Sequence, residues 1–499
     1  MNPRTLADIS KLEELDRSTL AALRARMTEV GFTSRGVAEA LARFESGPPV
    51  IGARVRNYHL RKQEGDAAKW MRLLMFSDVL DRAEAEAAIG PLYGALARAG
   101  VLVEEGGTVS SPLRFGLIAD VIVLCDRMIG ELGVMGFGTT TISLLHASVP
   151  TKPRRTALEV GCGAGTIAIR LARHATRVVA TDIDPRAIAF TKFNARLNAV
   201  DNVDAREGDM LAPVAGETFD LVVSQPPYLP VVGGEAHRVV TQGGTRGDEL
   251  ALRLLAGLPK VLARGGLAVI RSDWLVPRSA DGQPDPDGAL ARARQHLGED
   301  LDLTIVSGPP VGLDGYAMIY AAGAREELDQ GFVDDYAARR DHLDGLGAAS
   351  VLAATTLVHR SGEKPASTSF RWTGPNAAFS PQGVQGIVAA RALARDDKKL
   401  LAAKVRVPKG TVFAEEQVGP GAEVESTLRA QFAPTALAVD IEMDRRLLFV
   451  LTALHEEPSV RDAIARYAAQ TETDVAEAED LLLPIIRDAV LQGFVTTEE

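Results

Sequence analysis

The sequence is poor in residues that cross-link a chain or bind metal ions. Cysteine occurs only at Cys125 and Cys162, which is too few for a disulfide framework or a cysteine-rich zinc site. The eight histidines are scattered along the chain, and neither HExxH nor CxxC occurs. We therefore expect no bound metal and a reducing, cytoplasmic environment.

Long apolar runs are also missing. No stretch of about 18 apolar residues occurs, as a membrane-spanning helix would require. The amino-terminal MNPRTLADISKLEELD carries acidic residues early and lacks the apolar core of a secretory signal. The sequence thus predicts no membrane association and no export.

Aromatic residues make up only 5% of the chain, so Leu, Val, Ile and Ala must build the cores. The formal net charge is −11, which disfavours non-specific binding to nucleic acid. The locally basic stretch RVRNYHLRK, residues 54–62, leaves nucleic-acid contact open there, although a solvated helix face is the simpler interpretation. A length of 499 residues suggests about three domains.

Residues 1–125 are predicted to form a mostly helical domain. Leu20, Leu23 and Met27 recur at helical spacing, and a helix is expected from Glu84 to Gly100. The following VLVEEGGTVSS is typical of two strands around a Gly-Gly turn. Two helices and a hairpin resemble a winged helix, a module that binds DNA, forms dimers or covers a substrate.

Residues 150–325 alternate short β-rich runs with helical stretches, which predicts a doubly wound α/β sheet, and the central domain is expected to span residues 126–325. The expected strands are TALEV, RVVATD, FDLVVSQ, GGLAVIRS, LDLTIVS and YAMIYAA. Only GPPVGLDG separates the last two, so we expect the final strand to run antiparallel.

Residues 326–499 are predicted to form an α+β domain for substrate recognition or dimerisation, so a homodimer is one alternative. Strands are expected at 367–372, 402–407, 412–416 and 436–442. The region from Asp444 to Phe494 is predicted to be helical, and its end again resembles part of a winged helix.

A glycine-rich turn carries the strongest chemical signal. In LEVGCGAG the strand ends at Glu159 and Val160, and Gly161, Gly163 and Gly165 precede a helix. Glycines permit a tight turn and close approach of a ligand to the backbone. Asp182 ends the next strand, where a carboxylate can accept hydrogen bonds from two ribose hydroxyls.

Two further strand ends are expected at the same edge of the sheet, where open α/β folds bind ligands. One carries the sequence REGDM with Asp209, and the other carries SQPPY with Gln225. In this order EVGCGAG, TDID, EGDM and SQPPY resemble the motifs of class I S-adenosylmethionine (SAM)-dependent methyltransferases. The chain resembles the "small-domain" type, which includes ribosomal RNA guanine-N2 enzymes and is similar to the glutamine-N5 enzymes, and this implies a Rossmann-like seven-stranded core.

The resemblance implies roles for particular residues in binding SAM and releasing S-adenosylhomocysteine. Glu159 and the three glycines would hold the methionine part, with Cys162 as a small filler in the turn. Asp182 would bind the ribose. The remaining cofactor residues would be Ile183 and Met210 against the adenine, Asp209 at its amino group, Ser224 beside the methyl group and Thr140 in the capping loop.

The SQPPY segment would orient the methyl acceptor. Gln225 and the Pro226 carbonyl would accept hydrogen bonds from a planar NH₂ group, and Tyr228 would stack on the substrate. Gln225 departs from the usual Asn or Asp by one methylene group, which leaves oxygen or carbon acceptors open. His237, in the following loop, is a candidate general base, and an exposed loop histidine is the alternative.

Three functions follow from these observations. The first is methylation of nitrogen or oxygen in a small molecule or peptide, in specialised metabolism such as natural product biosynthesis. The second is methylation of ribosomal RNA or a translation protein. The third is a winged-helix nucleic-acid regulator with a degenerate core, against which the intact glycine and aspartate motifs argue.

Overall fold

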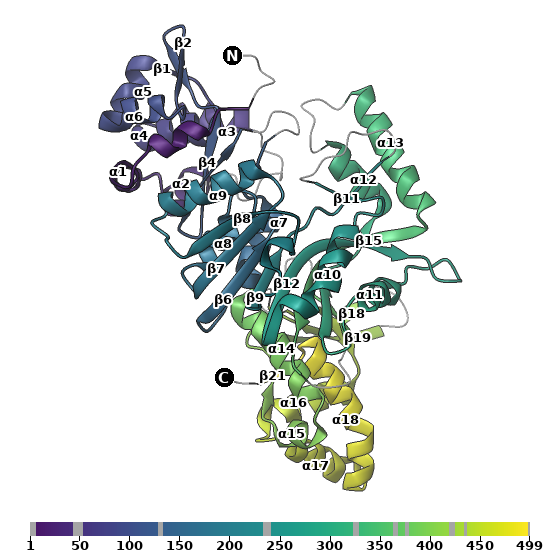
Figure 1. Ribbon diagram of the computed structural model, residues 1–499. Helices are drawn as coiled ribbons and strands as arrows, with labels where there is room; N and C mark the ends of the chain where they lie inside the picture. The colour runs from purple at the N-terminus through teal and green to yellow at the C-terminus, as the bar shows by residue number, and fades with distance from the viewer. Residues whose placement is uncertain are drawn as a thin grey trace. The chain divides into compact units, whose positions relative to one another are not determined.

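The computed structural model describes residues 6–42, 53–127, 133–232, 241–322, 329–362, 368–374, 379–418, 425–433 and 437–497. The chain divides into two compact units (Figure 1). The first contains Met1–Leu145, Lys152–Gly266 and Tyr320–Tyr336. The second contains His146–Thr151, Leu267–Ile319 and Ala337–Glu499. None of the helices in the described ranges is long and apolar enough to cross a bilayer.

The amino-terminal part of the first unit combines short helices with small β-hairpins. The helical spacing of Leu20, Leu23 and Met27 is confirmed, since all three are buried in one helix. Its elements are α1 (Arg17–Glu29), α2 (Ser34–Leu41), α3 (Ala53–Leu60), α4 (Asp66–Trp70), β1 (Leu80–Asp81), α5 (Arg82–Ile89), α6 (Tyr93–Arg98), β2 (Val103–Glu105), β3 (Thr108–Ser110), β4 (Leu113–Ile118) and β5 (Val121–Asp126), with single turns at Ser10–Glu14, Met71–Met75 and Gly90–Leu92.

The prediction of one continuous helix from residue 84 to residue 100 is wrong, because two shorter helices, α5 and α6, occupy this stretch. Gly90 has a φ of 70° and Pro91 follows it, and together they interrupt the helical hydrogen bonds between α5 and α6. The hairpin β2–β3 is confirmed, with Glu105 paired to Thr108. The identification of this region as a winged helix stays a prediction.

A parallel sheet with the strand order β8-β7-β6-β9 forms the centre of the first unit. These strands are the predicted ones, and they alternate with helices as the sequence indicated (Figure 1). Buried Val, Leu and Ala side chains, together with Phe219, fill the interiors of β6, β7 and β9, as expected for a sheet covered on both faces. The elements are α7 (Thr139–Ser148), β6 (Arg154–Val160), α8 (Thr166–Leu171), β7 (Ala175–Asp182), α9 (Pro185–Leu197), β8 (Val203–Glu207), β9 (Phe219–Ser224), β10 (Leu229–Pro230), β11 (Gln242–Gly244) and α10 (Glu249–Val261).

Strand β12 (Leu262–Pro277) leads into the second unit, where the strand order is β12-β15-β13-β16. The prediction of an antiparallel strand at residues 316–322 is wrong. Residues 316–322 lie in helix α12, because an apolar run without alternation fits a buried helix as well as a strand. The antiparallel strand is β15, which pairs with both β12 and β13. The elements are α11 (Pro286–Gln295), β13 (Asp302–Ser307), β14 (Val311–Gly312), α12 (Leu313–Ala322), α13 (Gln330–Gly345), β15 (Ala348–His359) and β16 (Thr368–Trp372).

The sheet of the second unit therefore continues past residue 325, where the sequence predicted the central domain to end. The remaining residues form a small antiparallel sheet, β18-β19-β20, and a helical cluster with its own apolar core. The helical region predicted from residue 444 to residue 494 is confirmed. The elements are α14 (Pro381–Ala394), α15 (Asp397–Ala402), β17 (Val405–Arg406), β18 (Val412–Val418), β19 (Glu425–Gln431), β20 (Ile441–Met443), α16 (Arg445–Glu456), α17 (Val460–Thr471), α18 (Val475–Gln492) and β21 (Thr496–Thr497).

Candidate active site

The glycine turn between β6 and α8 has the conformation that its sequence predicted. Gly161, Gly163 and Gly165 all have positive φ values, of 74°, 52° and 79°. A Cβ atom on Gly165 would lie 2.8 Å from Thr191 Oγ1 in α9, so this position requires glycine for space as well as conformation. A Cβ atom on Gly161 would meet no atom within 4 Å. The turn therefore has open space beside its first glycine.

Glu159 lies directly before this turn and is almost fully buried, with 4% of its surface exposed. Its Oε2 accepts a hydrogen bond of 2.6 Å from the backbone N–H of Ala168 in α8. Burial raises the pKa of the Glu159 carboxyl well above its ordinary value, and the nearby Asp182 raises it further. A cation bound beside Glu159 would stabilise its ionised form.

Asp182, at the carboxyl end of β7, is tied to the glycine turn. Its Oδ2 accepts from the backbone N–H of Gly163 at 2.8 Å, and its Oδ1 accepts from that of Asp184 at 3.0 Å. Burial raises the pKa of the Asp182 carboxyl, and these backbone hydrogen bonds partly oppose the rise. Each oxygen retains a lone pair for a ligand hydroxyl. Ile183, the next residue, is 54% exposed and offers an apolar surface.

The end of β8 is fixed against the end of β7. The backbone N–H of Gly208 donates to the Asp182 carbonyl at 2.8 Å, and Thr181 Oγ1 donates to the Met210 carbonyl at 2.9 Å. Met210 has a φ of 50°, so the chain turns sharply there. Asp209 is half exposed and forms an ion pair with Arg253 in α10, a partner that no motif in the sequence indicated.

The end of β9 places two polar residues next to the glycine turn. Ser224 is buried and donates to the Val160 carbonyl at 2.8 Å. Gln225 Nε2 donates to Thr140 Oγ1 at 2.9 Å. Thr140 was expected in a loop that caps the cofactor, but it lies in the first turn of α7. The other amide atom, Gln225 Oε1, is buried and has no hydrogen-bond partner. A buried acceptor without a partner is costly, so this oxygen is a ready acceptor for a ligand N–H.

The loop with Pro226, Pro227 and Tyr228 is held by the segment QGGTRG, residues 242–247. Strand β10 pairs with β11, and the backbone N–H of Leu229 donates to the Thr241 carbonyl at 2.8 Å. A Cβ atom on Gly243 would lie 2.4 Å from the Pro227 carbonyl oxygen. One on Gly247 would lie 2.3 Å from the Tyr228 carbonyl oxygen. Glycines in this segment thus allow close backbone packing that fixes the loop.

The parallel register brings the predicted cofactor residues to one edge of the sheet. Val160 pairs with Thr181 on one side and with Ser224 on the other, and Asp182 pairs with Glu207. His237 falls within residues 233–240, outside the described residues, so its role stays a prediction. Among the described residues, no three His, Cys, Asp or Glu side chains form a candidate metal site.

Cys162 is 5% exposed, and its Sγ lies 3.3 Å from Thr191 Oγ1. Burial raises the pKa of this thiol well above its ordinary value, which disfavours a reactive thiolate. Sequence reasoning missed Thr191, whose hydroxyl also donates to the Gly163 carbonyl at 3.0 Å. No pattern in the sequence could have identified it, because it contacts the turn only after α9 packs.

Comparisons with known proteins agree with this geometry. The family model "Methyltransferase small domain" matches residues 137–266. A candidate protein N5-glutamine methyltransferase of Methanocaldococcus jannaschii is 36% identical over 135 residues, which cover 26% of this chain and 67% of that protein. The release factor glutamine methyltransferase of Xylella fastidiosa is 38% identical over 143 residues, 26% of this chain and 49% of that enzyme. The chain thus spans about half the length of the release-factor enzyme.

Among solved structures, the ribosomal protein L11 methylase of Lactobacillus delbrueckii matches with 23% sequence identity. The match covers 34% of this chain and 72% of that one, with a TM-score of 0.25, which carries no argument about function. The sequence relatives and the strand-end motifs carry the assignment. The chain therefore belongs to the methyltransferase small domain family of class I SAM-dependent methyltransferases, and it is a methyltransferase enzyme.

Proposed function

We propose that this enzyme transfers the methyl group of SAM to the side-chain amide nitrogen of a glutamine in a protein. The observation that carries the proposal is the buried oxygen of Gln225, which lacks a partner while the amide nitrogen of the same side chain is bound to Thr140. This arrangement leaves the amide oxygen as an acceptor for the substrate. An amide NH₂ group supplies the donor that this acceptor needs.

The sequence relatives are named as protein glutamine and release factor glutamine methyltransferases, which supports a glutamine of a release factor as the substrate class. They favour the translation-protein alternative of the sequence analysis over specialised metabolism, which no comparison supports. The net charge of −11 argues against ribosomal RNA, since an acidic chain attracts phosphates poorly.

The residues at the strand ends fit SAM as their cofactor. Open space lies beside Gly161, the Asp182 carboxylate retains lone pairs, and Ile183 is exposed. Glu159 and the glycine turn would hold the methionine part, Asp182 the ribose, and Ile183 and Met210 the adenine. Asp209 has two oxygens, so it can accept from the adenine amino group while it pairs with Arg253. Bound SAM supplies an electrophilic methyl group on sulfur.

The chain's own residues then orient the acceptor. Gln225 Oε1 accepts one amide N–H, the Pro226 carbonyl accepts the other, and Tyr228 covers the planar face. Transfer forms the N–C bond, breaks the S–C bond and releases the amide proton to solvent, which leaves an N-methyl amide and S-adenosylhomocysteine. Fixing the nitrogen in line with the methyl group is the main contribution to the rate.

The test is methyl transfer from labelled SAM to purified release factor of the same organism. We expect label in one glutamine-containing peptide, and we expect acid hydrolysis to release it as methylamine, as an N-methyl amide requires. Label that stays on carbon or oxygen after hydrolysis would contradict the proposal. So would label that enters only the RNA or small-molecule fraction of a host lysate.

A further inference from the structure

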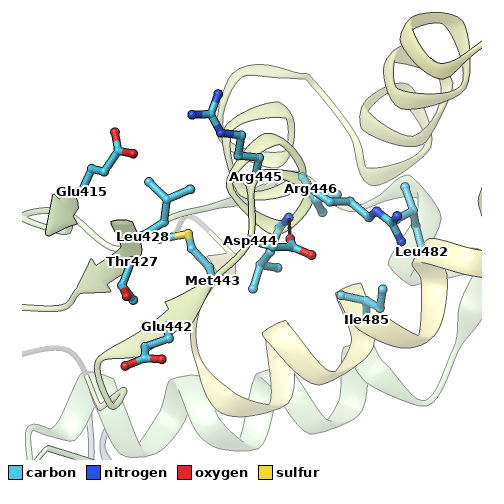
Figure 2. Close-up of a pocket in the computed structure, with 12 residues that line it drawn as sticks. Glu415, Thr427, Leu428, Glu442, Met443, Asp444, Arg445, Arg446, Leu482 and Ile485 are labelled. Carbon is cyan, nitrogen blue, oxygen red and sulfur yellow. Dashed lines mark hydrogen bonds between the residues drawn. The ribbon is translucent and has the colours of Figure 1, made fainter. Parts of the chain in front are cut away.

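The second unit contains a cavity that the family assignment does not explain. Its volume is about 740 Å³, within the range of ligand sites, and it lies between the sheet β18-β19-β20 and the helices α16 and α18 (Figure 2). We call it the C-terminal cavity. One wall is a row across the sheet in which Glu415 pairs with Leu428 and Leu428 pairs with Met443. The family model ends at residue 266, far before these elements.

Apolar side chains form much of its lining and continue outside it. Leu428 and Met443 face the cavity from the strands, and Leu482 and Ile485 from α18 (Figure 2). Ile485 is 38% exposed, and Leu481 in the same helix is 45% exposed. Phe413, two residues before Glu415 on the same face of β18, is 40% exposed. An exposed apolar surface that extends beyond a cavity is typical of protein interaction sites.

The charges around the cavity are unevenly paired. Within the part of the chain that the structure describes, Arg445 and Arg446 at the start of α16 have no ion pair or hydrogen bond through their side chains. Their acidic neighbours are engaged: Asp444 accepts from the backbone N–H of Leu447 at 2.7 Å, and Glu442 pairs with Arg429 at 2.6 Å. Two cations on the helix side are therefore available to a ligand carboxylate.

The opposite rim has the opposite sign. Glu415 on β18 is exposed and has no ion pair with any described residue. A bound segment would thus be oriented, with its acidic group toward α16 and away from β18. Helix α18 also carries Glu477, Glu479 and Asp480 near its start, and these residues would repel phosphate groups. The charge pattern favours a polypeptide over a nucleic acid.

We propose that the C-terminal cavity docks the protein substrate through a segment that carries a large apolar side chain next to a carboxylate. The apolar side chain would fill the space between Leu428, Met443 and Ile485, and the carboxylate would bind Arg446 or Arg445. The proposal rests on the proposed function, because it takes the methylated protein as the occupant. It assigns the second unit to substrate recognition apart from the reacting glutamine.

The test uses the full-length chain and fluorescently labelled release factor as the probe. Arg446→Glu and Ile485→Asp should each weaken binding by at least tenfold in anisotropy titrations. They should raise the KM for release factor similarly while kcat at saturation and transfer to a short glutamine peptide stay unchanged. Val475→Asp is the matched control, because Val475 is 49% exposed on the same helix and does not line the cavity. Melting temperatures establish that each variant is folded.

The outcomes separate the two proposals. If Arg446→Glu and Ile485→Asp bind release factor as the wild type does, the docking proposal is overturned even where methylation is intact. If the wild type binds release factor through this cavity but methylates no glutamine, the proposed function is overturned and docking stands. A wild-type chain that does not bind release factor also overturns the docking proposal.

Discussion

The candidate active site and the C-terminal cavity are built on different principles. The active-site residues lie in short motifs, each at the end of a strand. The side chains of Glu159, Asp182 and Ser224 form hydrogen bonds with backbone atoms in or next to the glycine turn. The C-terminal cavity is lined by side chains from a three-stranded sheet and two helices. The side chains of Arg445 and Arg446 form no hydrogen bond or ion pair with the described residues. The side chains of the first site are held by hydrogen bonds within the chain, whereas the second site leaves charges for a partner to satisfy.

This contrast predicts larger losses from changes at the strand ends than from changes in the second unit. The largest expected effect follows from Gln225→Ala, which removes the acceptor for the substrate amide. We expect kcat to fall about 10²–10³-fold, the usual cost of losing one such hydrogen bond in the transition state. Binding of SAM in calorimetry should change less than twofold. Thr140→Val removes only the hydrogen bond to the Gln225 amide nitrogen, so it should lower kcat by a smaller factor.

Two glycine substitutions, one in the glycine turn and one in the second unit, compare the effects of an added Cβ atom on stability. Gly165→Ala places a Cβ atom 2.8 Å from Thr191 Oγ1 at a φ of 79°, so it should destabilise the fold by about 2–4 kcal/mol through strain and overpacking. Gly386→Ala in α14 meets no atom within 4 Å, and it should stabilise its helix by about 0.5–1 kcal/mol. Urea denaturation measures the free energy of unfolding of both variants. Equal changes in the two variants would contradict the predicted difference between the glycine turn and the second unit.

Asp182→Ala should weaken SAM binding by more than tenfold, which is a loss of more than about 1.4 kcal/mol, because two ribose hydroxyls lose their acceptor. Calorimetric titration with SAM measures the change. Asp201→Asn, an exposed carboxylate that pairs with Arg17, is the control and should leave the affinity unaltered. Unchanged affinity in Asp182→Ala would place the ribose elsewhere.

The smallest effect should be a pH dependence that arises from Glu159. Its folded pKa is raised by burial, so the unfolded chain ionises first as pH rises above the ordinary value of 4.5. Stability is therefore lost as pH rises from that value toward the folded pKa, and a tenfold difference in proton affinity corresponds to about 1.4 kcal/mol. Glu159→Gln should melt at a higher temperature than the wild type without SAM, by a margin that grows from pH 4 to pH 7.

The matched control is Glu207→Gln, which changes an exposed carboxyl group at the end of β8. Its melting temperature should follow that of the wild type across the same pH series. A margin that is constant with pH in Glu159→Gln would show that the buried carboxyl does not titrate differently in the folded chain.

Sequence reasoning predicted the parallel strands and the glycine turn because their signals are local. A β-rich run that leads into a glycine-rich turn can be recognised from neighbouring residues alone. The error at residues 316–322 has the opposite cause, since an apolar run of that length fits helix and strand equally and packing decides. Strand β15, which has twelve residues, was missed, and its place between β12 and β13 depends on residues that are distant in the sequence.

The sequence by itself determined the order of the motifs, the residue types at the strand ends and the family that they indicate. Only the tertiary structure decided which Gln225 amide atom is bound to Thr140 and which is left without a partner. It also decided that Thr191 packs against Gly165 in the glycine turn. In the C-terminal cavity, it placed Arg446 beside Leu482 (Figure 2). The physical reason is that hydrogen bonds and steric contacts between distant residues exist only after the elements pack, whereas backbone conformation and strand patterning follow from neighbours in the chain.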